Sequence, residues 1–228
     1  MSAPTTQVTH PLAPLVGLAA LTFSALYFVS DVMEFARGGF STSQLVLTYV
    51  AESAIPVFVL GLYAVQRPHI GTLGLLGAIG YAYAYIFFTG TVLLALVNRP
   101  ADWESLVGEL GPWVAIHGLL MVVAGSAFGI AIVKARVLPG WTGMTLFAGV
   151  ILVALSSMLP SIAQTICAGV RDLGFAGMGL FLLTRPTSDA VSLRRRPQAR
   201  TRSALTRRQT RKTPASSTTA RSVVHVHP

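Results

Sequence analysis

Six long apolar segments constrain this chain more than any other feature of its sequence. A helix needs about 20 mostly apolar residues to cross the ~30 Å hydrocarbon core of a bilayer. Segments of about this length recur along the chain, separated by short polar connections, at residues 12–32, 45–66, 71–97, 113–135, 142–160 and 162–184. The sequence therefore predicts an all-α fold, a polytopic bundle of six transmembrane helices.

The composition excludes an ordinary soluble domain. Of 228 residues, 53% are hydrophobic and 11% are charged, whereas soluble domains carry roughly a quarter charged residues. Cys167 is the one cysteine, so the chain has no internal disulfide and no CxxC metal or redox motif. These numbers indicate an integral membrane protein.

The charges divide the chain into three parts, which are a short N-terminal tail (1–11), the bundle (12–184) and a basic C-terminal tail (185–228). The C-terminal tail holds eleven of the seventeen Lys and Arg residues and one acid, Asp189. Such a segment cannot bury enough apolar surface to fold, so we expect it to be disordered. Arg194, Arg195 and Arg196 follow the last span and can attract anionic lipid headgroups, at ~1 kcal/mol each. The tail has no folded module for specific nucleic-acid binding.

The same charges predict the orientation, because cytoplasmic loops carry an excess of Lys and Arg. One side of the predicted bundle holds Arg67, Lys134, Arg136 and the basic tail, whereas the other holds Arg37 and Arg99. We therefore expect a multi-pass protein of the bacterial cytoplasmic (inner) membrane with both termini in the cytoplasm. The first span is expected to remain as a helix, because no clear signal-peptide cleavage site follows it.

The connection between the third and fourth spans predicts a short additional helix. Asp102 has the side chain of an N-cap, and Trp103, Leu106 and Leu110 fall on one helical face. We expect this helix over residues 102–110, on the outer membrane surface. A lid over an outer pocket is the alternative.

Polar and ionisable side chains within or at the ends of the spans mark candidate functional positions, since a charge at the centre of a membrane helix costs roughly 2.5 to 3.5 kcal/mol. Counting ~1.5 Å per residue, they all fall in the outer half of the membrane. The sequence thus predicts an outward-facing polar pocket lined by Asp31, Glu52, His117, Gln164, Arg171 and Asp172.

We expect Glu52 to pair with Arg171, because an unpaired buried charge is costly. Asp172 would then contact His117, Gln164 or water. Two interpretations remain open. The charges could be a structural latch between helices, or they could bind a cation, a proton or a small polar ligand. Acids outnumber bases in this region, which favours a cation or a proton.

Motifs for known membrane chemistry are absent from the sequence. It has no HExxH zinc motif, no GxSG serine motif and no GxxxxGK[ST] nucleotide loop. Only His117 is available at membrane depth as an axial haem ligand, and a haem between helices needs two. We therefore assign no catalytic residue, no metal ligand and no cofactor, and no reaction.

The turn at residues 137–143 has the sequence VLPGWTG, and Leu159 and Pro160 end the following span. In these features the chain resembles a group of small uncharacterised bacterial multi-span proteins, in which a VLPxWxG turn joins two helices. The resemblance covers residues 12–184. It implies the six-helix architecture and carries no catalytic residues.

Two functions follow as hypotheses. The first is a small transporter or sensor with an outward-facing acidic pocket. The second is a structural or interaction protein whose polar residues hold the helices together and whose basic tail binds anionic lipid or a partner.

Overall fold

A computed structural model describes residues 11–156 and 159–184, and within these residues all regular structure is helical. This confirms the all-α prediction. The helices are α1 (Ala13–Arg37), α2 (Thr42–Val65), α3 (Gly71–Asn98), α4 (Trp103–Leu110), α5 (Pro112–Ala135), α6 (Gly140–Ser156) and α7 (Ser161–Thr184).

Five of these helices, α1, α2, α3, α5 and α7, are long and apolar enough to cross a membrane. The other apolar helix, α6, has 17 residues, about 25 Å at 1.5 Å per residue. It ends at Ser156, earlier than the predicted segment 142–160. The sixth crossing therefore stays a prediction.

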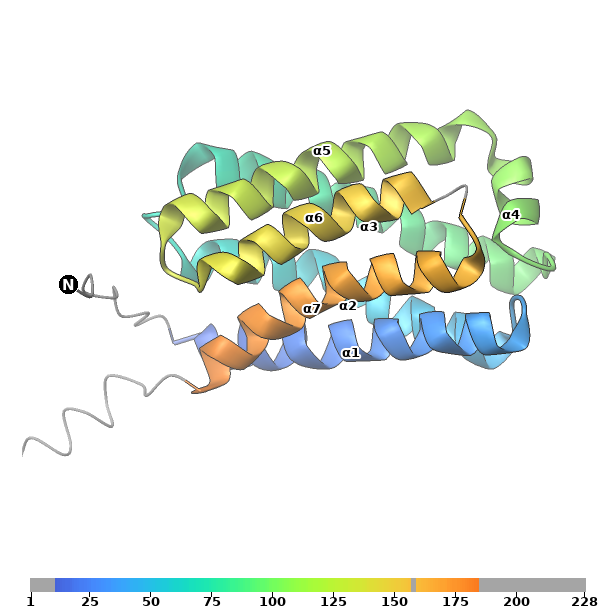
Figure 1. Ribbon diagram of the computed structural model, residues 1–228, viewed down its shortest axis with the longest axis horizontal. Helices are drawn as coiled ribbons and strands as arrows, with labels where there is room; N and C mark the ends of the chain where they lie inside the picture. Colours follow the sequence, from blue (N-terminus) through green and yellow to red (C-terminus); the bar gives the residue numbers. More distant parts are fainter. Residues whose placement is uncertain (1–10, 157–158, 185–228) are drawn as a thin grey trace, which may run out of the picture. The chain divides into compact units, whose positions relative to one another are not determined.

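The six longer helices form a closed ring. Each packs against its neighbours along the chain, and α7 packs against α1 to close the ring. Figure 1 shows these helices running along one common direction, with α4 across one end of the bundle. The start of α1 and the end of α7 lie at the other end, together with the α2–α3 and α5–α6 connections. Below, these are called the α4 end and the opposite end.

The interior of the ring is aromatic and aliphatic, and its exterior is also apolar. Tyr81, Phe58 and Phe128 are buried, whereas Val57 and Val97 on the outer surface are 72% and 78% exposed. In water such an exterior would expose far more apolar surface than a soluble monomer normally does. In a bilayer it contacts lipid tails, which suits an integral membrane protein.

Small residues let the helix backbones approach closely. A Cβ atom added to Gly17 in α1 would lie 2.9 Å from the carbonyl oxygen of Gly179 in α7. Gly129 in α5 and Gly143 in α6 meet in the same way, at 2.7 Å. Close packing at small residues is a main source of helix association in lipid. These four glycines therefore act as packing positions between helices.

The short helix α4 was predicted correctly. The Asp102 carboxylate accepts a hydrogen bond from the backbone N–H of Ser105 at 2.9 Å, as an N-cap does. Leu106 is 1% exposed and packs in a small apolar cluster with Leu45 of α2 and Val92 of α3. α4 is thus anchored on the ends of α2 and α3.

We expect Asp102→Ala to loosen the first turn of α4, because it removes the cap from the Ser105 amide. Amide hydrogen exchange at Ser105 should be faster in Asp102→Ala than in the wild type, and close to wild type in Asp102→Asn, which can still cap. Hydrogen bonds from Ser105 lower the pKa of Asp102 below its ordinary 3.8. Above pH 3.8 the Asp102 carboxylate is therefore ionised and its stabilising effect is fully present. The effect is lost as the pH falls through the lowered pKa of Asp102. Equal exchange in all three proteins would contradict this role.

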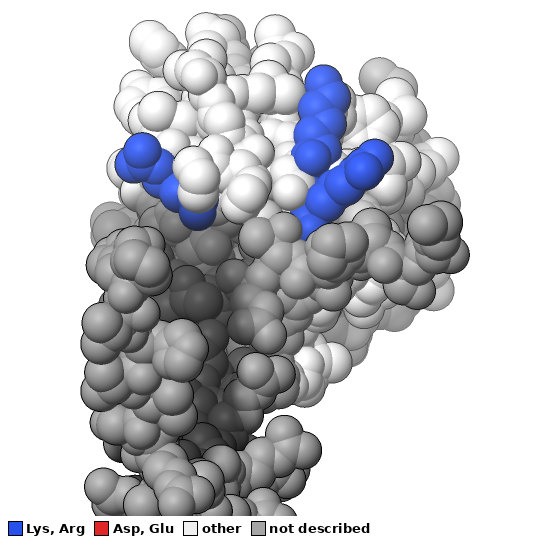
Figure 2. Space-filling view, turned by 90° about the vertical axis from the view of Figure 1, so that its left-hand side faces the viewer, with Lys and Arg blue, Asp and Glu red and all other residues white. Residues whose placement is uncertain are grey.

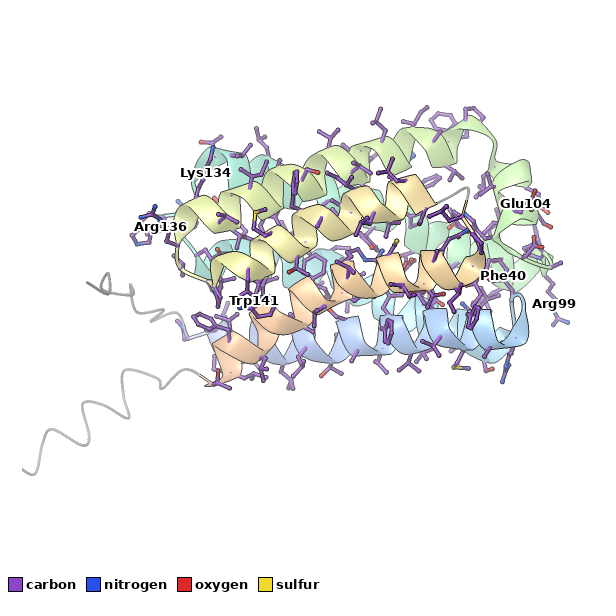
Figure 3. The ribbon with its side chains drawn as sticks, viewed as in Figure 1. Phe40, Arg99, Glu104, Lys134, Arg136 and Trp141 are labelled. Atoms are coloured by element: carbon purple, nitrogen blue, oxygen red, sulfur yellow. The ribbon has the colours of Figure 1, made fainter. Side chains whose placement is uncertain are left out.

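The two ends of the bundle differ in charge. Arg67 and Arg136 are exposed in the two connections at the opposite end, and Lys134 is exposed in the last turn of α5 beside them. Figure 2 shows Lys and Arg but no Asp or Glu on this end, among the described residues in view. Figure 3 places Lys134 and Arg136 here with Trp141, and places Arg99 and Glu104 at the α4 end. The predicted tail, with Arg194, Arg195 and Arg196, lies outside the described residues.

Candidate functional site

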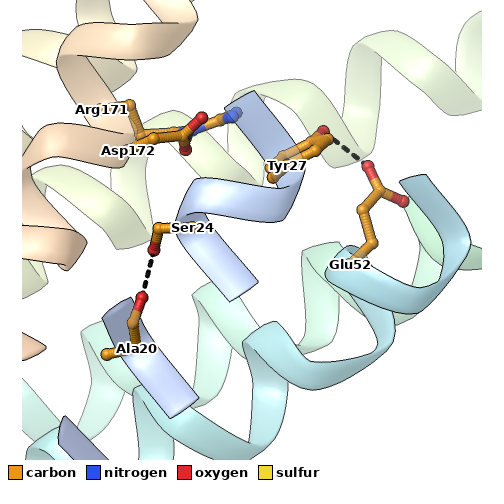
Figure 4. A network of polar contacts seen from close by, with 6 residues as sticks. All are labelled: Ala20, Ser24, Tyr27, Glu52, Arg171 and Asp172. Carbon is orange, nitrogen blue, oxygen red and sulfur yellow. Dashed lines mark hydrogen bonds and ion pairs between the residues drawn. The ribbon is translucent and has the colours of Figure 1, made fainter. Parts of the chain in front are cut away.

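Four polar side chains meet about halfway along the helices, and we call them the polar centre. They are Tyr27 of α1, Glu52 of α2, and Arg171 and Asp172 of α7 (Figure 4). Glu52 and Arg171 are each 4% exposed, and Asp172 is 5% exposed. Charges at this depth are expensive, so their contacts decide what the centre can do.

Arg171 forms an ion pair with its own chain neighbour. Its Nε donates a hydrogen bond to Oδ1 of Asp172 at 2.9 Å. The predicted pairing of Arg171 with Glu52 is therefore wrong. Adjacent residues leave a helix about 100° apart, but the long arginine side chain turns back to reach the next carboxylate. The ion pair lies within α7 and does not cross to α2.

Tyr27 connects this ion pair to Glu52. Its hydroxyl donates a hydrogen bond to Oε1 of Glu52 at 2.6 Å. The face of the same ring lies 4.6 Å from Cζ of Arg171, within range of a cation–π interaction. One side chain of α1 therefore contacts the charged residues of both α2 and α7.

Several buried polar atoms around the centre have no hydrogen-bond partner in the structure. Among the described residues, these atoms include Oε2 of Glu52, Nη2 of Arg171 and Oδ2 of Asp172. A buried polar atom without a partner costs roughly 1 to 3 kcal/mol. Such atoms in one region mark a place where water, a proton or a polar ligand can bind.

Pro56 lies one helical turn after Glu52, within α2. Proline has no backbone N–H, so it cannot donate the helical hydrogen bond to the carbonyl oxygen of Glu52. The helix nevertheless continues to Val65. The backbone carbonyl oxygen of Glu52 is therefore available as a hydrogen-bond acceptor, in addition to the carboxylate of the same residue.

A second group of polar residues lies between α1 and α2, nearer the α4 end, and we call it the polar seam. Nε2 of Gln44 donates to Oε2 of Glu34 at 3.2 Å and to Oγ1 of Thr48 at 2.9 Å. The hydroxyls of Thr48 and Ser30 lie 2.7 Å apart. Ser30, Gln44 and Thr48 are buried, and Glu34 is partly exposed. The seam ends one helical turn from Tyr27 and Glu52.

Of the six predicted pocket residues, the structure brings Glu52, Arg171 and Asp172 together. Asp31 is partly exposed on α1, one turn beyond Tyr27, and interacts electrostatically with Asp172 and Arg171. It therefore borders the centre, and among the described residues no hydrogen bond joins its side chain to the centre.

The structure does not bring His117 to the centre. Its Nδ1 lies 2.9 Å from the carbonyl oxygen of Trp113, and its ring stacks on Phe87 with 3.8 Å between centroids. It belongs to α5, which packs against α3, α4 and α6 and not against the helices that carry the centre's charges. Of the three alternatives expected for Asp172, which were His117, Gln164 and water, the structure therefore rules out His117.

Gln164 also lies apart from the centre. Its Nε2 donates to the carbonyl oxygen of Leu159 at 2.8 Å, which places it at the start of α7. Arg171 follows seven residues later, about 10 Å along the helix. The side chain of Gln164 therefore contacts the start of its own helix and not the polar centre.

From the sequence, we assigned none of Tyr81, Tyr85, Ser30 and Gln44 to the candidate site. Tyr81 and Tyr85 are four residues apart, so they share one face of α3, and both are buried. A sequence signal existed in α2, where Gln44, Thr48 and Glu52 follow one another at intervals of four. No group of three or more His, Cys, Asp or Glu side chains able to hold a metal ion was found among the described residues.

In comparisons with known proteins, no family model matches the chain, and no curated protein and no solved structure matches it. The resemblance suggested by the turn at residues 137–143 therefore stays a prediction.

Tyr27→Phe separates the two contacts of this tyrosine. It removes the hydrogen bond to Glu52 and keeps the ring below Arg171. Because hydrogen bonds to charged groups contribute about 1.5 to 3 kcal/mol, we expect the free energy of unfolding to fall by about that amount. Tyr27→Leu should cost ~1 kcal/mol more, since it also removes the cation–π contact. Unfolding titrations in detergent measure both, and equal stability of Tyr27→Phe and wild type would contradict the assignment.

Proposed function

We propose that this protein resides in the bacterial cytoplasmic membrane, crosses it six times and has both termini in the cytoplasm. Five long apolar helices and the apolar helix α6 support this proposal. The basic connections at the opposite end support the orientation, because Lys and Arg are retained on the cytoplasmic side. The α4 end then faces outward.

We further propose that the protein is a small transporter or sensor that binds a proton, a cation or a small polar ligand at the polar centre. The observation that carries this proposal is the unequal charge of the centre. It holds two carboxylates and one guanidinium, and the guanidinium contacts Asp172. Glu52 is buried with one hydrogen bond from Tyr27 and no cation within ion-pair distance among the described residues. A carboxylate so placed is stabilised by taking up one positive charge.

Uptake into vesicles tests this function. The purified protein is reconstituted into proteoliposomes that contain a pH-sensitive dye, and a gradient of protons, Na⁺ or K⁺ is imposed. We expect uptake or exchange in the wild type and at least a tenfold loss in Glu52→Gln. Ser53→Ala is the matched control, because Ser53 is the next residue of α2 but is exposed and bonds to the carbonyl of Val50. Equal rates in wild type and Glu52→Gln would contradict the proposal.

The second candidate function is a structural or interaction protein, with the polar centre as a latch and the basic tail as a contact for anionic lipid or a partner. The contacts of Tyr27 with both α2 and α7 favour the latch. Deletion of residues 185–228 discriminates the two functions. It should leave uptake unchanged if the centre carries the function, and should abolish the cellular phenotype if the tail carries it.

A further inference from the structure

The polar seam offers a connection between the α4 end and Glu52. Glu34 is partly exposed, and from it hydrogen bonds run through Gln44 to Thr48 and Ser30. Thr48 precedes Glu52 by four residues on α2, about 6 Å along the helix. Thr91 of α3 and Ser156 of α6 are also buried polar side chains, but each bonds to a backbone carbonyl of its own helix, whereas the seam joins side chains of α1 and α2.

The seam is more polar than helix association requires. Oε1 of Gln44 is buried without a hydrogen-bond partner, and so is Oε2 of Glu52. Interhelical hydrogen bonds in membranes contribute only about 0.6 kcal/mol on average, less than the cost of such unpartnered acceptors. A seam that only joined the helices would be more stable without them. Both oxygen atoms can instead accept a hydrogen bond from a group that carries a proton.

The surroundings of Glu52 favour a proton as its ligand. Tyr27 of α1 donates a hydrogen bond to Glu52. The other groups that interact with it electrostatically are Asp31 of α1, Tyr81 and Tyr85 of α3, and Arg171 and Asp172 of α7. A metal cation prefers about six oxygen ligands, and the positive charge of Arg171 opposes a second cation nearby. A proton needs one carboxylate oxygen, and Oε2 is available.

We propose that Glu52 exchanges a proton with the α4 side of the membrane along the polar seam. This inference rests on the proposed function and names its ligand and its route. In the exchange, a proton from outside water binds Oε2 of Glu52 and converts the carboxylate to a carboxylic acid. The formal charge of the centre then changes from −1 to zero. Each transfer along the route breaks one O–H bond and forms another, beginning with a hydronium ion in the outside water, so the net result is one new O–H bond at Glu52.

The seam residues have different roles along this route. The hydroxyls of Thr48 and Ser30 can each accept one proton and donate another, so they can pass a proton on. The amide of Gln44 cannot do so without changing its tautomer. It positions Thr48 through Nε2, and its Oε1 can hold a water molecule that carries the proton past it.

Infrared difference spectroscopy after a rapid pH jump tests the route on the full chain in lipid nanodiscs. The C=O stretch of the protonated Glu52 carboxyl is assigned as the band that Glu52→Gln removes. We expect Thr48→Val to slow the appearance of this band at least tenfold and to leave its midpoint pH unchanged. Thr48→Ser should restore the rate. Thr91→Val is the matched control. Thr91 is also buried, and its hydroxyl likewise donates to a carbonyl of its own helix, that of Phe88, but it lies outside the seam, whereas Thr48 also contacts the side chains of Ser30 and Gln44.

The outcomes separate the route from the function. If the Glu52 band appears but Thr48→Val does not slow it, the route is wrong while the proposed function stands. If the midpoint pH moves with Na⁺ or K⁺ concentration, a metal cation competes at Glu52 and the proton assignment is overturned. If no band is lost in Glu52→Gln, Glu52 binds no proton, and both the inference and proton uptake at the centre fail.

Discussion

Arg171→Leu should lower the free energy of unfolding by about 3 to 5 kcal/mol. This is the usual cost of removing one partner from a buried ion pair. Asp172 would keep its charge in the interior without the hydrogen bond from Nε of Arg171. Adding Asp172→Asn to Arg171→Leu should recover most of this loss, because the double variant leaves no unpaired charge at residue 172. Denaturant titration in detergent measures all three proteins.

The control for this prediction is Arg37→Leu. Arg37 is exposed at the end of α1 and bonds to the hydroxyls of Ser41 and Ser43. We expect its loss to cost less than about 1 kcal/mol. A loss below 1 kcal/mol for Arg171→Leu as well, or a double variant less stable than the single one, would show that Arg171 and Asp172 do not form this ion pair.

Gly149→Leu should also destabilise the bundle strongly. A Cβ atom at Gly149 in α6 would overlap the backbone nitrogen and Cα of Arg171 in α7. Backbone atoms cannot rotate away as a side chain can, so the two helices would have to separate. Overpacking of this kind costs typically 1 to 3 kcal/mol, and occasionally more. Since the displaced residue is Arg171, we also expect uptake by the reconstituted protein to fall.

Gly118→Leu is the matched control for Gly149→Leu. A Cβ atom at Gly118 in α5 would meet nothing within 4 Å. Leucine is a better helix former than glycine by ~1 kcal/mol, so this variant should be as stable as wild type or slightly more so. Equal losses in the two variants would mean that α6 and α7 are not in close contact at Arg171.

Much of the fold could be predicted from the sequence, because membrane spans depend on length and hydropathy. The predicted segment 71–97 and the helix Gly71–Asn98 nearly coincide. The end of α1 was predicted less well. The apolar run stops at residue 32, but the helix continues to Arg37, where Gly38 adopts a left-handed conformation with φ 69°. Glu34 in this last part of the helix accepts a hydrogen bond from Gln44 of α2, a tertiary contact that hydropathy does not contain.

The site was predicted in part, for a similar reason. Burial cost identified Glu52, Arg171 and Asp172 as interior positions, since charges avoid lipid. The partners of these three side chains could not be predicted, because they depend on which helices pack together when the ring of helices closes. α7 packs on α1, which brings Arg171 over the ring of Tyr27 and not beside Glu52. His117 was misplaced because depth in the membrane says nothing about which neighbour a helix faces.

The central claim is that the protein keeps the unpaired carboxylate of Glu52 for binding and not for stability. The free energy of unfolding of Glu52→Gln tests it most directly. Glutamine has the same shape, and its Oε1 can still accept the hydrogen bond from Tyr27, but it carries no charge into the interior. If the claim is right, Glu52→Gln is at least as stable as wild type while uptake is lost. A loss of stability of about 2 kcal/mol or more, with uptake unchanged, would contradict the claim and identify the polar centre as a latch.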